Sequence, residues 1–238
     1  MQDGTCSIRH AEAFDLDAVT ALEARCFPPS EAASPDAFAM RLRAFPQCLW
    51  LLEEDGRIVS MIGGMTSEAA DLCDAMYEGT SLYEERGAWL MIFGVATDPD
   101  RQHRGLASQL MRYVIAQMQS QRRDGLVLTC KEALVPFYRQ FGFVNEGRSA
   151  SVHGGACWYQ MRLCLPAGLE RCILRGEECR FRHGGRDCLL YGWEQCDGYV
   201  LNVQDDTGAL LWQSAPMRQE ACAAAFREFL DHSQGGSR

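Results

Sequence analysis

A short turn in the centre of the chain has the residue types of an anion site. It reads Gln102-His103-Arg104-Gly105-Leu106-Ala107, and an apolar segment precedes it. The residues that follow, through Ser108, open a segment with helical spacing. The first N–H groups of a helix have no intrahelical partner, and the helix dipole adds partial positive charge there. Small residues at Gly105 and Ala107 would let a phosphate reach those groups.

Two other nucleotide-binding motifs do not fit this turn. The Walker loop requires Gly-Lys-Ser/Thr after its glycines, and that run is absent here. The dinucleotide fingerprint needs more glycines and an acidic residue on the next strand, and this sequence has neither. The turn alone therefore predicts a phosphate site without naming the ligand.

Two titratable side chains are candidates for proton transfer near such a site. His153 lies in the run Ser151-Val152-His153-Gly154-Gly155 and titrates in a useful range. Glu132 comes just after a predicted central strand. Each also has a purely structural interpretation, because His153 could be a surface histidine in a turn and Glu132 could cap a helix.

The elements around the turn predict an α/β (α+β) fold with a mixed sheet. Strands are expected at residues 6–9, 48–53, 57–63, 88–96, 126–129, 144–152 and 157–163, the last two forming a hairpin that turns at Gly154-Gly155. Helices are expected around 14–22, after Ser34-Pro35, from 106 to 118 and at 136–141. Phe14 and Tyr113 are assigned to the apolar faces of their helices, and the polar segment 66–86 to a loop or short helix.

The pattern changes after Pro166-Ala167-Gly168, which we take as the boundary between domains 1–165 and 166–238. Beyond it, short strands alternate with glycine-rich turns, and a helix is expected from about residue 217 to 230. We expect a small antiparallel β unit closed by that helix. Its apolar residues, including Trp193 and Trp212, could bury against the first domain or form a homodimer contact.

Composition and charge exclude several classes of protein. The formal net charge of -9 argues against a general nucleic-acid binder, which needs a basic face. No secretory signal or bilayer-spanning run is visible, so a cytoplasmic protein without a membrane partner is expected. The 12 cysteines then predict reduced, buried thiols. Zinc at Cys172, Cys179, Cys188 and Cys196 is a minor alternative, and no metal is assigned.

The central turn resembles the pyrophosphate-binding loop of the GNAT acetyltransferases, in its Q/R-x-x-G-x-G/A form. Two further segments resemble the arylalkylamine (serotonin) N-acetyltransferase branch of that superfamily. They are Cys130-Lys131-Glu132-Ala133-Leu134-Val135-Pro136-Phe137-Tyr138, and Cys26-Phe27 followed by Ser30-Glu31-Ala32 and Ser34-Pro35. The resemblance spans about residues 7–163 and implies the GNAT fold, with a mostly antiparallel sheet flanked by helices.

The resemblance also implies acetyl-CoA as co-substrate and assigns residues to it. Backbone N–H groups of Val95, Ala96 and Thr97 would bind the pantetheine arm and polarise the thioester carbonyl. The pyrophosphate would lie on the loop formed by Gln102, His103, Arg104, Gly105, Leu106, Ala107 and Ser108. Tyr138 would protonate the departing CoA thiolate, so that its removal slows the reaction without abolishing it. Phe27, Glu31 and Pro35 match positions of the amine pocket.

The general base is left open by the sequence. The vertebrate branch of the family uses two histidines on the strand before the loop, and Met91 and Phe93 occupy those positions here. His153, Glu132, Glu31 or a water chain could replace them.

We therefore expect an N-acetyltransferase acting on a small primary amine, either arylalkylamine-like or a polyamine. The alternatives are a peptide or protein N-acetyltransferase and a non-catalytic acetyl-CoA-binding module.

Overall fold

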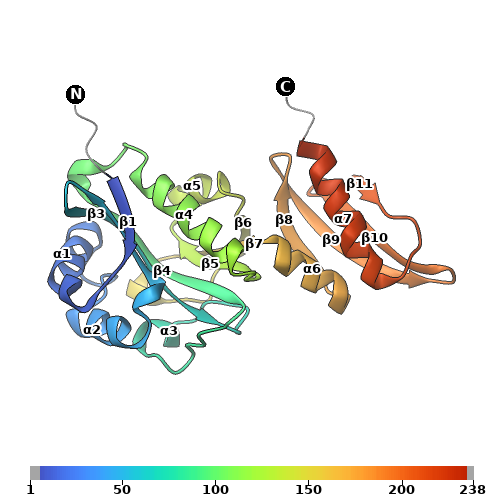
Figure 1. Ribbon diagram of the computed structural model, residues 1–238. Coiled ribbons are helices and arrows are strands. Elements are labelled where there is room, and N and C mark those ends of the chain that lie inside the picture. The colour runs from blue at the N-terminus through green and yellow to red at the C-terminus, as the bar shows by residue number, and fades with distance from the viewer. Residues whose placement is uncertain (1–5, 235–238) are drawn as a thin grey trace.

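Seven apolar-rich strands form one mixed sheet in the order β1-β2-β3-β4-β5-β7-β6 (Figure 1). They are β1 (Cys6–His10), β2 (Leu49–Glu54), β3 (Arg57–Ser67), β4 (Trp89–Thr97), β5 (Gly125–Cys130), β6 (Val144–Arg148) and β7 (Tyr159–Cys164). Within the described residues, 6–234 of this computed structural model, β4 and β5 pair in parallel and the other neighbours are antiparallel. The predicted mixed, mostly antiparallel sheet is confirmed.

Helices cover both faces of this sheet, because β2 is apolar on both sides. Trp50 and Leu52 pack into the cluster that includes α4 (Leu106–Ser120), whereas Leu49 and Leu51 pack with α1 (Leu16–Cys26) and α2 (Pro35–Ala44). The α2 helix begins as predicted, since Ser34 Oγ accepts the Ala37 N–H at 3.1 Å and Pro35 opens the helix. Two short helices, α3 (Ala75–Glu78) and α5 (Val135–Arg139), complete this part.

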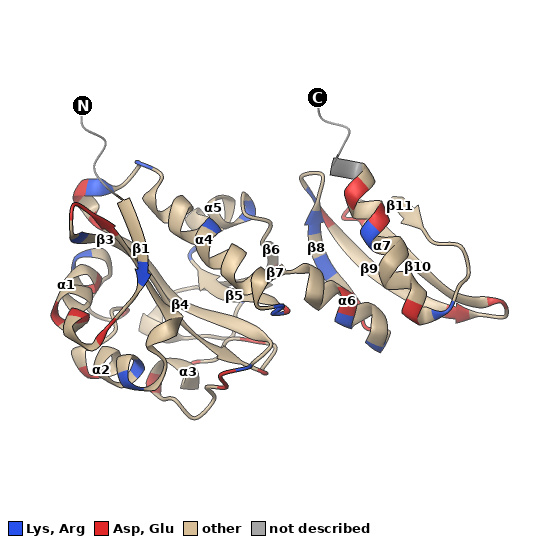
Figure 2. Ribbon diagram, viewed as in Figure 1, with Lys and Arg blue, Asp and Glu red and all other residues tan. Residues whose placement is uncertain are grey.

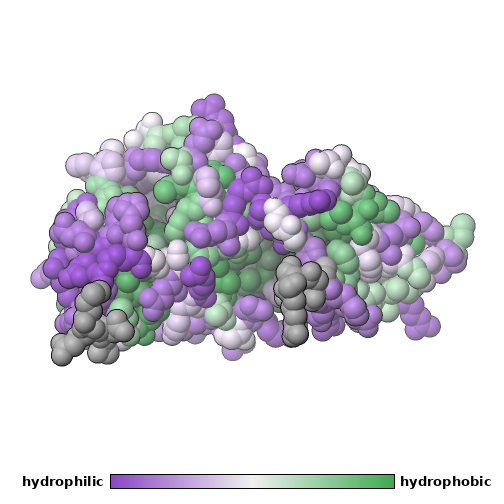
Figure 3. Space-filling view, turned by 90° about the horizontal axis from the view of Figure 1, so that it is seen from above, coloured by the Kyte–Doolittle hydropathy of each residue, from purple (hydrophilic) through white to green (hydrophobic). Residues whose placement is uncertain are grey.

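A second, four-stranded antiparallel sheet follows, in the order β11-β10-β9-β8. Its strands are β8 (Cys179–His183), β9 (Arg186–Gln195), β10 (Gly198–Asp205) and β11 (Leu210–Gln213), and α6 (Pro166–Arg175) and α7 (Gln219–Gln234) accompany it. It has an apolar cluster of its own, in which Leu190, Val203 and Phe226 are at most 1% exposed. Seen from above, the two parts form separate lobes with a notch between them (Figure 3).

The sequence did not predict helix α6, which begins at the Pro166-Ala167-Gly168 segment assigned as the domain boundary. Pro166 is instead the first residue of the helix, a position where its missing N–H costs nothing. Gly168 packs so closely on Asp124 that a Cβ there would lie 2.2 Å from the Asp124 carbonyl oxygen. A glycine needed for close packing has the same sequence signature as a flexible one.

Other boundaries and burial assignments were also wrong. Phe14 lies in a 3-10 turn and is 73% exposed, and Tyr113 is 38% exposed on the outer face of α4. The β3 strand extends to Ser67. The last hairpin is shorter than predicted, because β6 ends at Arg148 and β7 begins at Tyr159. The intervening segment is a long loop with a 3-10 turn at His153–Gly155.

All twelve cysteines are free, but they are not uniformly buried. Cys6, Cys73, Cys157 and Cys196 are exposed, so the prediction of buried thiols holds only for the remainder, two of which are half-buried. Among the described residues, no group of three or more His, Cys, Asp or Glu side chains could hold a metal ion. The Cys179 thiol instead lies 3.1 Å from the Cys164 sulfur.

Acidic and basic residues are interspersed along the helices and strands of both parts (Figure 2). Among residues 6–234, no helix is both long and apolar enough to cross a membrane.

Gly125 tests the packing between β5 and its neighbours. A Cβ there would lie 2.0 Å from the Leu163 carbonyl oxygen and 2.7 Å from the Trp89 ring. We expect Gly125→Ala to lower the free energy of unfolding by about 1–3 kcal/mol, measured by urea denaturation. Gly79→Ala, with nothing within 4 Å of its Cβ, is the control and should change stability little. Equal effects of the two substitutions would contradict this packing.

Candidate active site

The phosphate-type loop lies at the start of α4 and is open to solvent. Gly105 precedes the helix with φ +80°, a conformation that glycine adopts readily, and nothing lies within 4 Å of where its Cβ would be. Gln102, His103 and Arg104 are exposed, whereas Leu106 is buried and fixes the first turn of the helix in the core. The first N–H groups of α4 therefore face an unobstructed surface.

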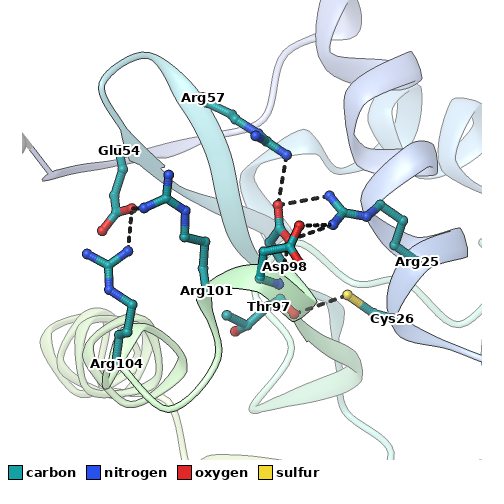
Figure 4. A network of polar contacts seen from close by, with 9 residues as sticks. Arg25, Cys26, Glu54, Arg57, Thr97, Asp98, Arg101 and Arg104 are labelled. Atoms are coloured by element: carbon teal, nitrogen blue, oxygen red, sulfur yellow. Dashed lines mark hydrogen bonds and ion pairs between the residues drawn. The ribbon is translucent and has the colours of Figure 1, made fainter.

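An ion-pair network holds this loop against the sheet and α1 (Figure 4). Asp98, whose side chain is 2% exposed, accepts hydrogen bonds from Arg25 and Arg57, both at 2.9 Å. Burial alone would raise the pKa of Asp98, but the Asp100 N–H and the two guanidinium groups outweigh it and lower that pKa.

A second group of ion pairs, made by Glu54, reaches the loop itself. Glu54, at the end of β2, pairs with Arg101 at 3.3 Å and with Arg104 at 3.2 Å (Figure 4). These contacts fix the loop on both sides of Gln102 and His103.

The last residues of β4 have an unpaired edge beside the loop. β4 pairs with β5 only from Trp89↔Gly125 to Ile92↔Leu128, but it stays paired with β3 as far as Thr97. The Asp98 N–H donates to the Val59 carbonyl of β3, and N–H groups alternate in direction along a strand. The N–H groups of Val95 and Thr97 therefore point away from β3, toward the gap left by β5, whereas that of Ala96 points toward β3.

A cleft of ≈ 730 Å³ opens at the same point, on the face of the sheet covered by α1 and α2. It reaches Phe93 and Gly94, where β4 begins to part from β5. Five carboxylates line the cleft, together with one arginine and one histidine: Glu23, Glu31, Asp36, Asp74, Glu78, Arg41 and His153. The balance of charge suits a cationic ligand.

His153 and Glu31, both named from the sequence, meet in the wall of this cleft. The His153 Nε2 lies 3.0 Å from the Glu31 carbonyl oxygen, so Nε2 carries the hydrogen of that bond and Nδ1 is the nitrogen left to accept a proton. The imidazole stacks on Tyr77, with ring centroids 4.7 Å apart. The Glu31 carboxylate pairs with Lys131 at 2.8 Å.

Four charged residues of the cleft were not named from the sequence: Glu23, Asp36, Arg41 and Asp74. Glu23 of α1 is 7% exposed and accepts the Ala33 N–H at 3.0 Å. Burial raises the pKa of its carboxyl, against the opposing effects of that N–H and of the charges on Arg41 and His153. A signal was present, because Glu23 follows Val19 by four residues and so falls on the apolar stripe of α1.

Arg41 lies on the inner face of α2 for the same reason, three residues after Phe38. Its guanidinium donates to the Tyr77 carbonyl at 3.1 Å and lies 4.7 Å from the centre of the Phe93 ring, while its Nε has no hydrogen-bond partner. Burial lowers the pKa of Arg41.

Only some of the other residues expected at the substrate site lie at the cleft. The Phe27 ring packs over Gly94, 3.7 Å from where its Cβ would be. Phe93 lines the cleft, whereas Met91 is fully buried in the core. Pro35 and Glu132 are exposed and lie outside the cleft lining.

Tyr138 is positioned by α5, which follows β5 directly. Its side chain is 6% exposed and packs edge-on against the rings of Phe137 and Phe143. Burial, with the Cys130 thiol nearby, raises the pKa of Tyr138 well above its usual value. The hydroxyl therefore stays protonated at neutral pH and can serve as a hydrogen-bond donor.

Residues 16–143 match the acetyltransferase (GNAT) family, and the chain belongs to that family. It is an acetyl-CoA-dependent N-acetyltransferase by class, as the sequence predicted. The residues present suit the co-substrate, because the open Gly105 turn at a helix start and the unpaired edge of β4 offer N–H groups to a pyrophosphate and an extended arm.

Solved structures share the fold at low sequence identity. The GphF GNAT-like decarboxylase in complex with isobutyryl-CoA is 22% identical with a TM-score of 0.58, covering 66% of this chain and 97% of its own. The loading GNATL domain of CurA from Lyngbya majuscula is 17% identical (TM-score 0.58, 66% and 96%). The ribosomal-protein-S18-alanine N-acetyltransferase from Escherichia coli is 19% identical (TM-score 0.51, 68% and 94%).

Substitution of Gly105 tests whether the loop before α4 binds the pyrophosphate. A methyl group in Gly105→Ala would stand between a phosphate and the N–H groups, so we expect CoA affinity to fall about 10- to 100-fold, the loss of one or two charge-assisted hydrogen bonds. The measurement is calorimetric titration with CoA. Gly185→Ala, at the same φ of +80° and equally open, supplies the same backbone strain far from the loop. If both variants bind CoA like the wild type, the loop does not hold the pyrophosphate.

Proposed function

We propose that the protein transfers the acetyl group of acetyl-CoA to a small primary amine that binds as a cation in the acidic cleft. The observation that carries this proposal is the position of the cleft. Its five carboxylates lie beside Phe93 and Gly94, where β4 parts from β5 and its edge becomes free. A positively charged amine would be attracted to the point where the thioester would end.

The backbone would supply the main stabilisation in this reaction. The amine nitrogen forms a bond to the carbonyl carbon as the bond from that carbon to sulfur breaks, and negative charge grows on the carbonyl oxygen. In this proposal the N–H groups of Val95 and Thr97 bind the arm and one of them faces that oxygen, whereas the Ala96 N–H, also expected there from the sequence, points toward β3. The first turn of α4, from Gly105 to Ser108, holds the pyrophosphate.

Tyr138 would act on the departing sulfur. A thiolate is a tolerable leaving group, with an ordinary thiol pKa of about 8.5. With its own pKa raised by burial, Tyr138 would donate a hydrogen bond to the sulfur rather than surrender its proton readily. Its contribution is therefore moderate.

Two classes of amine fit the cleft. Phe93 and Tyr77, which line the cleft, would pack against the ring of an arylalkylamine. Phe27, which the sequence resemblance places in the amine pocket, packs over Gly94 and is outside the cleft lining. Asp36 and Glu78, exposed at the rim, would pair with a second positive charge and so favour a polyamine. A protein substrate is the second candidate, supported by the fold shared with the S18-alanine acetyltransferase.

Turnover of a panel of amines distinguishes between these classes of substrate. We expect CoA release from acetyl-CoA with phenethylamine, tryptamine or spermidine to exceed release with a short peptide. Tyr138→Phe should lower kcat by up to about 100-fold without abolishing turnover, since general-acid assistance of a good leaving group is at the low end of its range. Tight acetyl-CoA binding with no turnover of any amine would contradict the proposal and favour a non-catalytic binding module.

We further propose that all of this chemistry lies in residues 1–165, since every residue named for it precedes β8. The second unit, 166–238, packs on the first through Trp89, which contacts the apolar clusters of both.

A chain ending at Pro166 tests that division. We expect it to fold, judged by circular dichroism, and to bind CoA with unchanged affinity. A folded truncated chain that no longer binds CoA would contradict the division.

A further inference from the structure

Glu23 is 7% exposed, and among the other carboxylates of the cleft only Glu31, with a side chain 9% exposed, is similarly buried. Asp74 is half-buried, and Asp36 and Glu78 are exposed. The backbone of Glu23 is part of α1, which packs on β3 and β4, so its position is fixed by the core rather than by a loop.

The other carboxylates have their oxygens occupied or lie elsewhere, so His153 is the competing base among the side chains of the cleft. The carboxylate of Glu31 is paired with Lys131 at 2.8 Å, and that of Asp74 accepts the Ser151 hydroxyl at 2.5 Å and the Val152 N–H at 3.2 Å. Glu132 lies outside the cleft lining.

The carboxylate of Glu23 has one oxygen anchored and one left for the cleft. Oε1 accepts the Ala33 N–H at 3.0 Å, which holds the end of the side chain in place. Arg41 lies nearby but is not within ion-pair distance of Glu23, since its guanidinium is directed to the Tyr77 carbonyl and the Phe93 ring. The charges of Arg41 and His153 act on Glu23 without a close ion pair, so the free oxygen of this anchored carboxylate can accept a proton from a bound ligand.

We propose that Glu23 is the general base that takes the proton from the amine in this cleft. The inference rests on the proposed function. The ammonium gives one proton to the Glu23 carboxylate, and the neutral amine then attacks the thioester carbon. The second proton leaves the nitrogen as the carbon–sulfur bond breaks and ends on the CoA sulfur, directly or through Tyr138. The Glu23 carboxylic acid finally releases its proton to solvent.

The base removes a large barrier. An alkylamine has a pKa of about 10, so only about one molecule in a thousand is neutral at pH 7. Because burial raises the pKa of Glu23, its carboxylate is a stronger base than an ordinary one, and it forms only as pH rises above the usual carboxyl range.

Other titratable groups face the same space and enter its pH dependence. They are Glu31 before α2, Asp36 and Arg41 on α2, Asp74, Tyr77 and Glu78 at α3, and His153 in the loop before β7. Cys26, on α1 outside the cleft lining, also interacts electrostatically with Glu23.

The test is the pH profile of kcat at saturating amine for the wild type, Glu23→Gln and Asp17→Asn. Glutamine keeps an oxygen that can accept the Ala33 N–H, so the fold should persist, and thermal unfolding checks this. We expect Glu23→Gln to lower kcat at pH 7 by about 10²- to 10⁴-fold. Its rate should climb with unit slope toward pH ~10 and approach the wild type there, because only free amine reacts. Asp17→Asn removes a charge from the exposed face of the same helix and should leave the profile unchanged.

The outcomes separate this inference from the proposed function. If the wild type turns over no amine, the proposed function fails. If the wild type is active and Glu23→Gln has the same pH profile, or raises KM with kcat intact, Glu23 is not the base although the activity stands. If Glu23→Gln does not fold, Glu23→Asp replaces it in the same measurement. A wild-type pH profile of kcat that has no acidic limb would by itself overturn the inference.

Discussion

Strands β4 and β5 run side by side for four residue pairs and then separate, and the candidate site depends on that separation. Up to Ile92↔Leu128 the two strands satisfy each other's backbone, as parallel neighbours in a buried sheet must. Beyond that point β4 remains paired with β3 alone, across a register shift at Gly63/Gly64, where a Cβ on Gly64 would lie 2.3 Å from the Met91 carbonyl oxygen. Backbone N–H groups left free in this way are unusual inside a sheet, and an extended ligand can satisfy them.

The rest of the molecule is arranged around this gap. On one side, the ion pairs of Asp98 and Glu54 fix the turn into α4 next to the end of β4. The free N–H groups at the start of the helix therefore lie near those at the end of the strand. On the other side α1, α2, α3 and the loop containing His153 enclose the acidic cleft. These segments are far apart in sequence. The Gly154 backbone packs against Glu31, where a Cβ would lie 2.5 Å from its Cγ, which shows how closely the two cleft loops fit.

The sequence predicted the first sheet, the glycine turn before α4 and most helices, because each has a local signature of periodicity, capping or glycine. It could not supply what depends on tertiary contact. Pro166 and Gly168 indicated a domain boundary, but Pro166 opens α6 and Gly168 packs closely on Asp124. Tyr113 has the helical spacing of a buried residue, yet it is 38% exposed. Glu23 and Arg41 were overlooked because charged residues in helices are usually solvated, although both fall on apolar stripes. Phe27 and Pro35, carried over from the family resemblance, and Glu132, named for its place after a strand, lie outside the cleft lining.

The most direct test of this account is amide hydrogen exchange with and without acetyl-CoA. Slower exchange is predicted at the N–H groups of Val95 and Thr97, which β5 leaves unpaired, and in the first turn of α4 after Gly105. The second sheet, β8 to β11, should be unaffected. If acetyl-CoA binds but leaves exchange at the end of β4 unchanged, the gap between β4 and β5 is not where the co-substrate lies, and the proposed site is wrong.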